Sequence, residues 1–107
     1  MAESFPRIVA DERGVWREDH PGRVSGIPWD EISCVSGYKL DRITEIDTCL
    51  VLDWGYGEFL ELYDRYPGFN QAVARITQQL PGIAPDWFEQ VESLGTSDPP
   101  VELWPRG

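Results

Sequence analysis

The clearest pattern in the chain is an alternation of side-chain types over residues 46–54. One set of positions is apolar apart from a threonine, and the other set carries two aspartates. The first set is Ile46, Thr48, Leu50, Leu52 and Trp54, and the second is Asp47, Cys49, Val51 and Asp53. Successive side chains of a strand point to opposite faces, so this period of two predicts a β-strand with one face in the core.

Shorter extended segments lie on both sides of this strand. They are residues 8–10, 15–17, 23–28 and 32–38 before it, and residues 58–63 and 101–104 after it. The turns at 11–14 and 19–22 both end in glycine, which a left-handed backbone position prefers. Residues 39–44 are expected to form the loop that leads into the long strand, and residues 54–57 the turn that follows it.

The segment Ile27-Pro28-Trp29-Asp30-Glu31-Ile32 predicts a sharp corner between two strands. Pro28 has no backbone N–H, so the hydrogen-bonded ladder has to end there or lie at a sheet edge. Trp29 and Ile32 stand one helical turn apart and would plug one end of the sheet. The alternative is that Trp29 stacks on a ligand.

After residue 63 the period changes from that of a strand to that of a helix. One apolar stripe at helical spacing consists of Phe69, Val73, Ile76 and Leu80. Pro81 and Gly82 end this helix, and Pro85 is expected to open a second, short one, because a proline at the first helical position loses no hydrogen bond. The order of elements predicts an α+β fold: a bent antiparallel sheet of about six to seven strands, closed by two C-terminal helices.

Charge is unevenly distributed along the chain. The formal net charge is −10, and residues 44–107 hold eleven acidic residues against three arginines. An acidic surface repels phosphate groups, so we expect no binding to nucleic acid or to an anionic membrane. A basic protein partner is the complementary expectation, and the alternative is that the charge serves only solubility.

Length and composition predict one domain spanning residues 1–107, since a second would lack the residues for its own core. With 41% hydrophobic residues, five of them Trp, the chain can fill such a core. No apolar run approaches the ~18 residues that span a bilayer, and the N-terminal residues have no secretory signal pattern. These features predict a cytoplasmic protein.

Few residues have the types and spacing that catalysis or metal binding needs. His20 is the only histidine and lies in a predicted turn, and Cys34 and Cys49 add at most two ligands, fewer than a closed zinc site requires. If the strands pair about a centre near residues 41 and 42, the two cysteines face each other. They would then be packed as buried thiols, and the alternative of a disulfide fits a reducing cytosol less well.

Asp53 and Glu58 flank the turn at 54–57, as the two carboxylates of a glycosidase flank a cleft. Any hairpin with charged ends has the same spacing, and the chain contains neither a glycine-rich phosphate loop nor a nucleophile motif. We therefore expect neither an enzyme nor a cofactor.

Acidic side chains gather on the predicted strands 46–54 and 58–63, with an aromatic side chain at the turn between them. They are Asp47, Asp53, Tyr56, Glu58 and Glu61. Carboxylates speed the encounter with a basic protein, and an aromatic side chain anchors it. This cluster is the predicted protein-binding site, and the alternative is an ordinary solvated sheet face.

Two segments resemble those of known proteins. The joint Ile27-Pro28-Trp29-Asp30-Glu31-Ile32 resembles the apolar-Pro-Trp-x-x-Ile joint of small bacterial pleckstrin-homology-like domains. The later run through Pro67-Gly68-Phe69-Asn70, Leu80-Pro81-Gly82-Ile83 and Phe88 is similar to the helical tail of a bacterial group that has no established activity. The resemblance covers residues 8–104 and implies a partial pleckstrin-homology-like barrel without site residues.

Lipid-binding pleckstrin-homology domains place Lys and Arg in their first hairpin turn. This chain has Asp11-Glu12-Arg13-Gly14 there, so the resemblance does not imply phosphoinositide binding.

Together these features predict a non-enzymatic bacterial protein that binds a basic protein, such as an immunity protein or inhibitor that neutralises a secreted toxin. One alternative is a small-ligand-binding or enzymatic domain with a pocket lined by Trp29, Trp54 and Trp87. The other is a homodimeric scaffold module that pairs through an uncovered strand edge.

Overall fold

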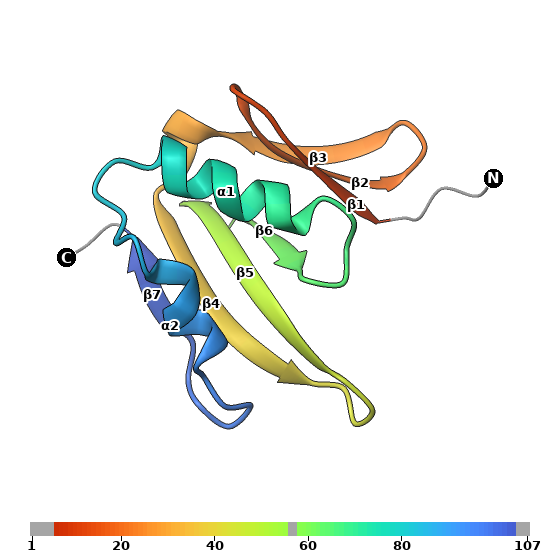
Figure 1. The fold of residues 1–107 in the computed structure, drawn as a ribbon. Coiled ribbons are helices and arrows are strands. Elements are labelled where there is room, and N and C mark those ends of the chain that lie inside the picture. The colour runs from red at the N-terminus through yellow and green to blue at the C-terminus, as the bar shows by residue number, and fades with distance from the viewer. Residues whose placement is uncertain (1–5, 56–57, 105–107) are drawn as a thin grey trace.

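The strands of the protein are divided between two antiparallel sheets. The computed structural model describes residues 6–55 and 58–104, and within them it contains seven strands, a 3₁₀ turn and two α-helices (Figure 1). The first sheet has the order β1-β2-β3, and the second has the order β6-β5-β4-β7. The elements in chain order are β1 (Arg7–Ala10), β2 (Gly14–His20), β3 (Arg23–Pro28), the turn η1 (Trp29–Glu31), β4 (Cys34–Asp41), β5 (Ile46–Gly55), β6 (Glu58–Tyr63), α1 (Phe69–Gln79), α2 (Trp87–Glu92) and β7 (Val101–Trp104).

The predicted α+β class and the order of strands and helices are confirmed, but the prediction of one bent sheet in a partial barrel is wrong. The strands form two sheets that do not close into a barrel. At β6, an edge strand of the second sheet, the carbonyl oxygen of Glu61 accepts a hydrogen bond from Nη1 of Arg17 on β2 at 2.8 Å. The two sheets are therefore linked at this edge by the side chain of Arg17. In one continuous sheet, β2 and β6 would instead be joined by backbone hydrogen bonds.

The core lies between the sheets and the helices. In Figure 1, α1 lies between the two sheets and α2 lies against β4. Gly37 on β4 allows this close approach, because a Cβ at that position would lie 2.7 Å from Val91 of α2. The alternate residues of β4, β5 and β6 that face this core are almost fully buried, and they are Val35, Leu50, Leu52, Leu60 and Leu62. The helices add Phe69, Ala72, Ile76, Trp87 and Val91.

The predicted corner after β3 is confirmed. Pro28 is the last residue of an edge strand, and Trp29 and Ile32 are both buried. The indole Nε1 of Trp29 donates a hydrogen bond to the carbonyl oxygen of Asp11 at 2.8 Å. The polar end of this side chain is therefore bonded within the protein, which favours the structural interpretation over ligand stacking.

The hairpin between β4 and β5 is centred between residues 43 and 44, two residues later than predicted, and this changes the strand register. β4 continues to Asp41, so the expected loop at 39–44 narrows to residues 42–45. Cys34 pairs with Asp53, and Cys49 pairs with Tyr38. The predicted contact between the two cysteines is therefore wrong. Both thiols are free, with Cys49 buried and Cys34 partly exposed.

Glycines at the turns have two different roles. Gly22 is in the left-handed region, with φ 81°, as predicted for the turn at 19–22. Gly14 does not have a left-handed backbone, so the prediction for the turn at 11–14 is wrong. Glycine is required there for another reason, because a Cβ on Gly14 would collide with the carbonyl oxygen of Ile27. In the turn at 54–57, Gly55 has φ 90°, and residues 56–57 lie outside the described part.

Gly68 joins α1 to the first sheet. It precedes the helix with φ 90°, and a Cβ there would collide with the carbonyl oxygen of Ile8 on β1. The backbone N–H of Ile8 in turn donates to the carbonyl oxygen of Pro67 at 2.7 Å. The start of α1 is thus held against β1 by a contact that only glycine permits.

This contact predicts a difference between two glycine substitutions. Gly82→Ala, at φ 78° with open space around it, should lower the free energy of unfolding by about 1–2 kcal/mol, the cost of a left-handed alanine. Gly68→Ala should cost that amount and about 1–3 kcal/mol more, because the added methyl group also collides with the backbone. Urea unfolding of both variants measures the difference. Equal losses of unfolding free energy would show that the close approach of Gly68 to Ile8 does not require glycine.

Candidate functional site: the outer face of the four-stranded sheet

The second sheet presents one face to the core and the opposite face outward. Because Leu50, Leu52, Leu60 and Leu62 face the core, the residues that alternate with them face away from it. The strand register brings side chains of all four strands together on this second face. We call it the outer face, and it consists of Cys34, Ser36, Tyr38, Leu40, Asp47, Cys49, Val51, Asp53, Phe59, Glu61, Tyr63 and Glu102.

Three carboxylates of the outer face have no ion-pair partner among the described Lys and Arg residues. They are Asp53 on β5, Glu61 on β6 and Glu102 on β7. Cys34 on β4 lies between two of them: burial, then the negative charges of Glu102 and Asp53, raise the pKa of its thiol. The field on this part of the sheet is therefore negative.

The middle of the outer face is aromatic. The hydroxyl group of Tyr38 donates a hydrogen bond to Oε2 of Glu61 at 3.1 Å. Beneath this pair, Cys49 is fully buried, and burial raises the pKa of its thiol to about 11. Phe59 on the edge strand β6 is 54% exposed, an unusual exposure for a phenylalanine. The arrangement places an apolar ring and hydrogen-bonding groups beside the carboxylates.

Asp47 is the clearest correction to the predicted site. It lies at the hairpin end of the outer face, but it is only 3% exposed. Its Oδ2 accepts hydrogen bonds from Arg42 at 3.4 Å and Arg65 at 3.2 Å. The Arg65 guanidinium also lies over the ring of Tyr63, 4.8 Å from its centroid. Asp47 therefore joins the hairpin to the end of β6 and is not available to a partner.

The remaining predicted site residues have different positions. Asp53 and Glu61 lie on the outer face, as expected for a surface site. Glu58 is exposed at the start of β6 and alternates with Phe59, so it does not share that face. Tyr56 lies outside the described residues. Glu102 was missed because β7 joins the sheet next to β4, and nothing in the local sequence of β7 identifies this neighbour.

The acidic excess is not neutralised within the protein. Six of the eight described Lys and Arg residues form ion pairs with nearby carboxylates, and they are Arg7, Arg13, Arg17, Lys39, Arg42 and Arg65. The carboxylates of the outer face away from Asp47 are outside these pairs. A basic partner would thus meet negative charge without first displacing an internal cation.

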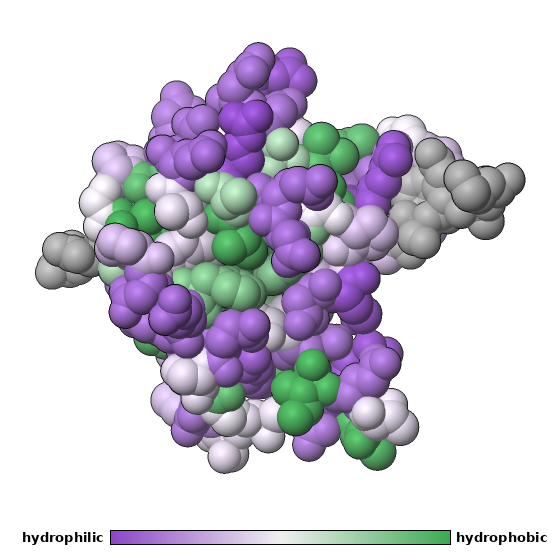
Figure 2. Space-filling model, viewed as in Figure 1, coloured by the Kyte–Doolittle hydropathy of each residue, from purple (hydrophilic) through white to green (hydrophobic). Residues whose placement is uncertain are grey.

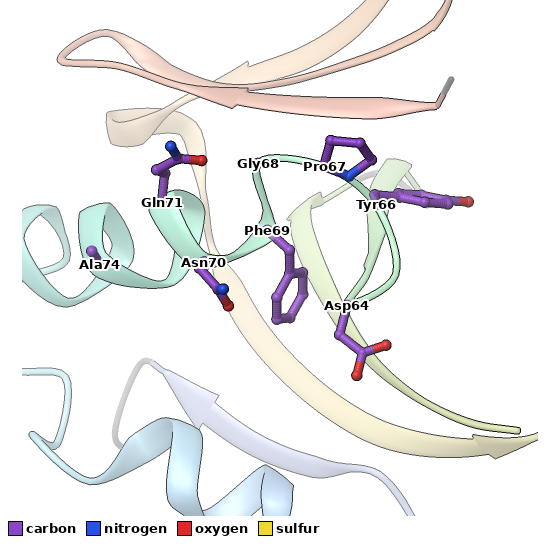
Figure 3. Close-up of a pocket in the computed structure, with 8 residues that line it drawn as sticks. All are labelled: Asp64, Tyr66, Pro67, Gly68, Phe69, Asn70, Gln71 and Ala74. Atoms are coloured by element: carbon purple, nitrogen blue, oxygen red, sulfur yellow. The ribbon is translucent and has the colours of Figure 1, made fainter. Parts of the chain in front are cut away.

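The hollow in Figure 3, of about 450 Å3, lies at the start of α1 and does not bring polar groups to one point. The side chains of Asn70 and Gln71 point to opposite sides of the helix there, and Tyr66 points away from both (Figure 3). Recognition of a small ligand normally needs polar groups that converge, so the outer face remains the stronger candidate.

The predicted pocket of three tryptophans is not formed. Trp87 is buried in the core, and its Nε1 donates to Oγ1 of Thr77 at 2.9 Å. Trp29 instead lines a hollow of about 430 Å3 together with Trp104. Trp54, on β5, is only partly buried.

Comparisons with protein-family models, curated proteins and solved structures find no match for this chain. The resemblance to pleckstrin-homology-like domains therefore stays a prediction. Among the described residues, no helix is long and apolar enough to cross a membrane. The same part of the chain contains no group of three or more His, Cys, Asp and Glu side chains that could hold a metal ion.

The buried ion pairs of Asp47 predict a stability effect. Asp47→Asn should lower the free energy of unfolding by about 1–3 kcal/mol, because two guanidinium groups lose their shared carboxylate. Glu58→Gln, which removes the same charge from an exposed position of the next strand, should change it by less than about 0.5 kcal/mol. Denaturant unfolding of both variants checks this, and similar losses would contradict the assigned role of Asp47.

The carboxylates around Cys34 predict a change in thiol reactivity. Glu102→Gln removes one of the charges that raise the pKa of the Cys34 thiol, so a larger fraction should be thiolate at about pH 8. Alkylation by iodoacetamide should then become faster, and its pH profile should shift toward lower pH. Glu89→Gln on α2 is the matched control, and an equal shift in that variant would show that only net charge matters.

Proposed function

We propose that this protein binds a basic protein through the outer face of its four-stranded sheet. The single observation that carries the proposal is the grouping of Asp53, Glu61 and Glu102 around exposed aromatic surface, with none of the three carboxylates in an ion pair with a described Lys or Arg. Carboxylates accelerate association with a positively charged surface, and buried aromatic side chains supply much of the affinity once contact is made.

The size and charge of the chain favour a particular kind of binder. A domain of 107 residues with a net charge of −10 has enough surface for an interface of ordinary size, about 800 Å2 on each partner. A rigid sheet can cover a basic active site or nucleic-acid-binding surface of such a partner and block it. This is the mode of action of an immunity protein or inhibitor directed at a cationic toxin.

Paired charge reversals test the proposal. Glu61→Lys/Glu102→Lys reverses two charges on the outer face, and Glu12→Lys/Glu89→Lys makes the same change in net charge at exposed positions outside it. Each chain is immobilised and offered soluble cellular proteins at low salt, and the retained proteins are identified. The affinity of the cationic protein retained by the wild-type chain is then measured by calorimetry at several salt concentrations.

The wild-type chain and the control variant should retain the same cationic protein, with an affinity that falls steeply as salt increases. The outer-face variant should bind it at least about tenfold more weakly, which corresponds to about 1.4 kcal/mol. Circular dichroism establishes that all three chains are folded. Equal binding by both variants, or binding that is indifferent to salt, would overturn the assignment of this face.

A further inference from the structure

The hairpin that joins β4 to β5 ends in an apolar tip. Ile43 is 96% exposed and Ile46 is 62% exposed. Figure 2 shows hydrophobic surface at the lower right, where Figure 1 places this hairpin. A branched aliphatic side chain exposed to this degree gains nothing from the core, and single exposed aliphatic residues are common on protein surfaces.

The backbone at Ile43 makes the choice of residue more unusual. Its φ of 78° lies in the left-handed region, and it is the only residue other than glycine with positive φ in the described part of the chain. A β-branched residue is strongly disfavoured in this conformation, whereas glycine, asparagine and aspartate tolerate it. The turn alone would therefore favour one of those three residues over isoleucine.

The backbone of the tip is held by hydrogen bonds within the turn. The N–H of Ile43 donates to Oδ1 of Asp41 at 2.8 Å, and the N–H of Arg42 donates to the carbonyl oxygen of Glu45 at 2.8 Å. The N–H of Thr44 donates to the carbonyl oxygen of Arg42 at 2.9 Å. A side chain presented by such a turn is already in position, so little conformational entropy is lost when it enters a pocket.

The tip and the outer face can reach the same partner. Glu61 and Glu102 lie level with Ser36, seven residues before Ile43, which at the rise of a strand is at most about 24 Å. Asp53 lies level with Cys34, at most about 31 Å from Ile43. An interface of about 800 Å2 on one partner is roughly 32 Å across, so one interface can include the tip and all three carboxylates. Asp41 is exposed beside the tip and Asp64 is exposed after β6, and neither has an ion-pair partner among the described Lys and Arg residues. Arg42 and Arg65 lie in the same region, but both are paired with Asp47. The charge left unpaired near the tip is therefore negative, so a pocket that receives the tip would be apolar with a basic rim.

We infer that Ile43 is the apolar anchor with which this protein enters a pocket on its basic partner. The inference rests on the proposed function, since it takes the partner to be the cationic protein bound by the outer face. It assigns the two surfaces different roles. The carboxylates attract and orient the partner, and the hairpin tip determines how long the complex lasts.

Exposed aliphatic side chains also lie on the first sheet. Val9 pairs with Trp16 and Val24 pairs with Glu18, and the ring of Trp16 fills the space that a side chain on Gly26 would occupy. Val9, Trp16 and Val24 line a hollow of about 380 Å3 on that sheet. Both valines lie in strands without positive φ, unlike Ile43, and this difference supplies the control for the experiment.

The deciding variant is Ile43→Asn. Asparagine tolerates the left-handed conformation, so this variant should unfold at a higher urea concentration than the wild-type chain. It should nevertheless bind the cationic protein retained by the wild-type chain about tenfold or more weakly, with the loss mainly in a faster dissociation rate. Val24→Thr, which shortens another exposed aliphatic side chain, should leave the affinity unchanged. A benzophenone cross-linker placed at position 43 should label that partner, and one at position 24 should not.

The possible results separate this inference from the proposed function. If Ile43→Asn binds like the wild-type chain while Glu61→Lys/Glu102→Lys does not, the tip is not an anchor and the outer face still is. If the wild-type chain retains no cationic protein, both proposals fall. Self-association in sedimentation velocity that Ile43→Asn abolishes would assign the tip to a second copy of the chain. Binding to phosphatidylcholine vesicles that the variant abolishes would assign it to a lipid surface, and either result overturns the inference.

Discussion

The turn from the first sheet into the second depends on hydrogen bonds made by Trp29. Its backbone N–H donates a hydrogen bond to the carbonyl oxygen of Arg13 at 3.1 Å, and its indole Nε1 donates one to the carbonyl oxygen of Asp11. Immediately after the corner, the N–H and hydroxyl group of Ser33 both donate to the carbonyl oxygen of Asp53. The β1–β2 turn thus sets the direction in which β4 begins, and β4 sets the position of the whole outer face. The surface that we propose for recognition is in this way determined by contacts that lie outside it.

Structural features that depend on neighbouring residues could be predicted from the sequence, and those that depend on distant residues could not. The alternation at 46–54 and the proline at 28 identified a strand and a corner correctly, because both are local. Asp47 was placed on the surface because its burial requires arginines at positions 42 and 65, which meet it only in the folded chain. A hairpin centred two residues later than expected was enough to separate Cys34 from Cys49, since register is shared along the entire strand pair.

Residues of the outer face differ in how far they belong to the packing of the domain. Asp47 and Cys49 are buried, whereas Phe59 and Glu102 are exposed. Asp53 is partly exposed, and its Oδ1 accepts a hydrogen bond from the N–H of Gly55 at 2.6 Å. Tyr38 connects the two sets, since its ring covers part of the sheet and its hydroxyl group bonds to Glu61. A partner can therefore dock without removing any group on which the fold depends.

The pairing of β7 with β4 also has a consequence for how the protein is made in the cell. Glu102 joins a strand that was synthesised more than sixty residues earlier, after both helices have been added. Chain segments emerge from the ribosome in order, and contacts between distant segments form late. The acidic surface is therefore incomplete on a nascent chain that lacks residues 101–104, even when β4, β5 and β6 have already paired. Binding through this surface would begin only after synthesis has passed that point.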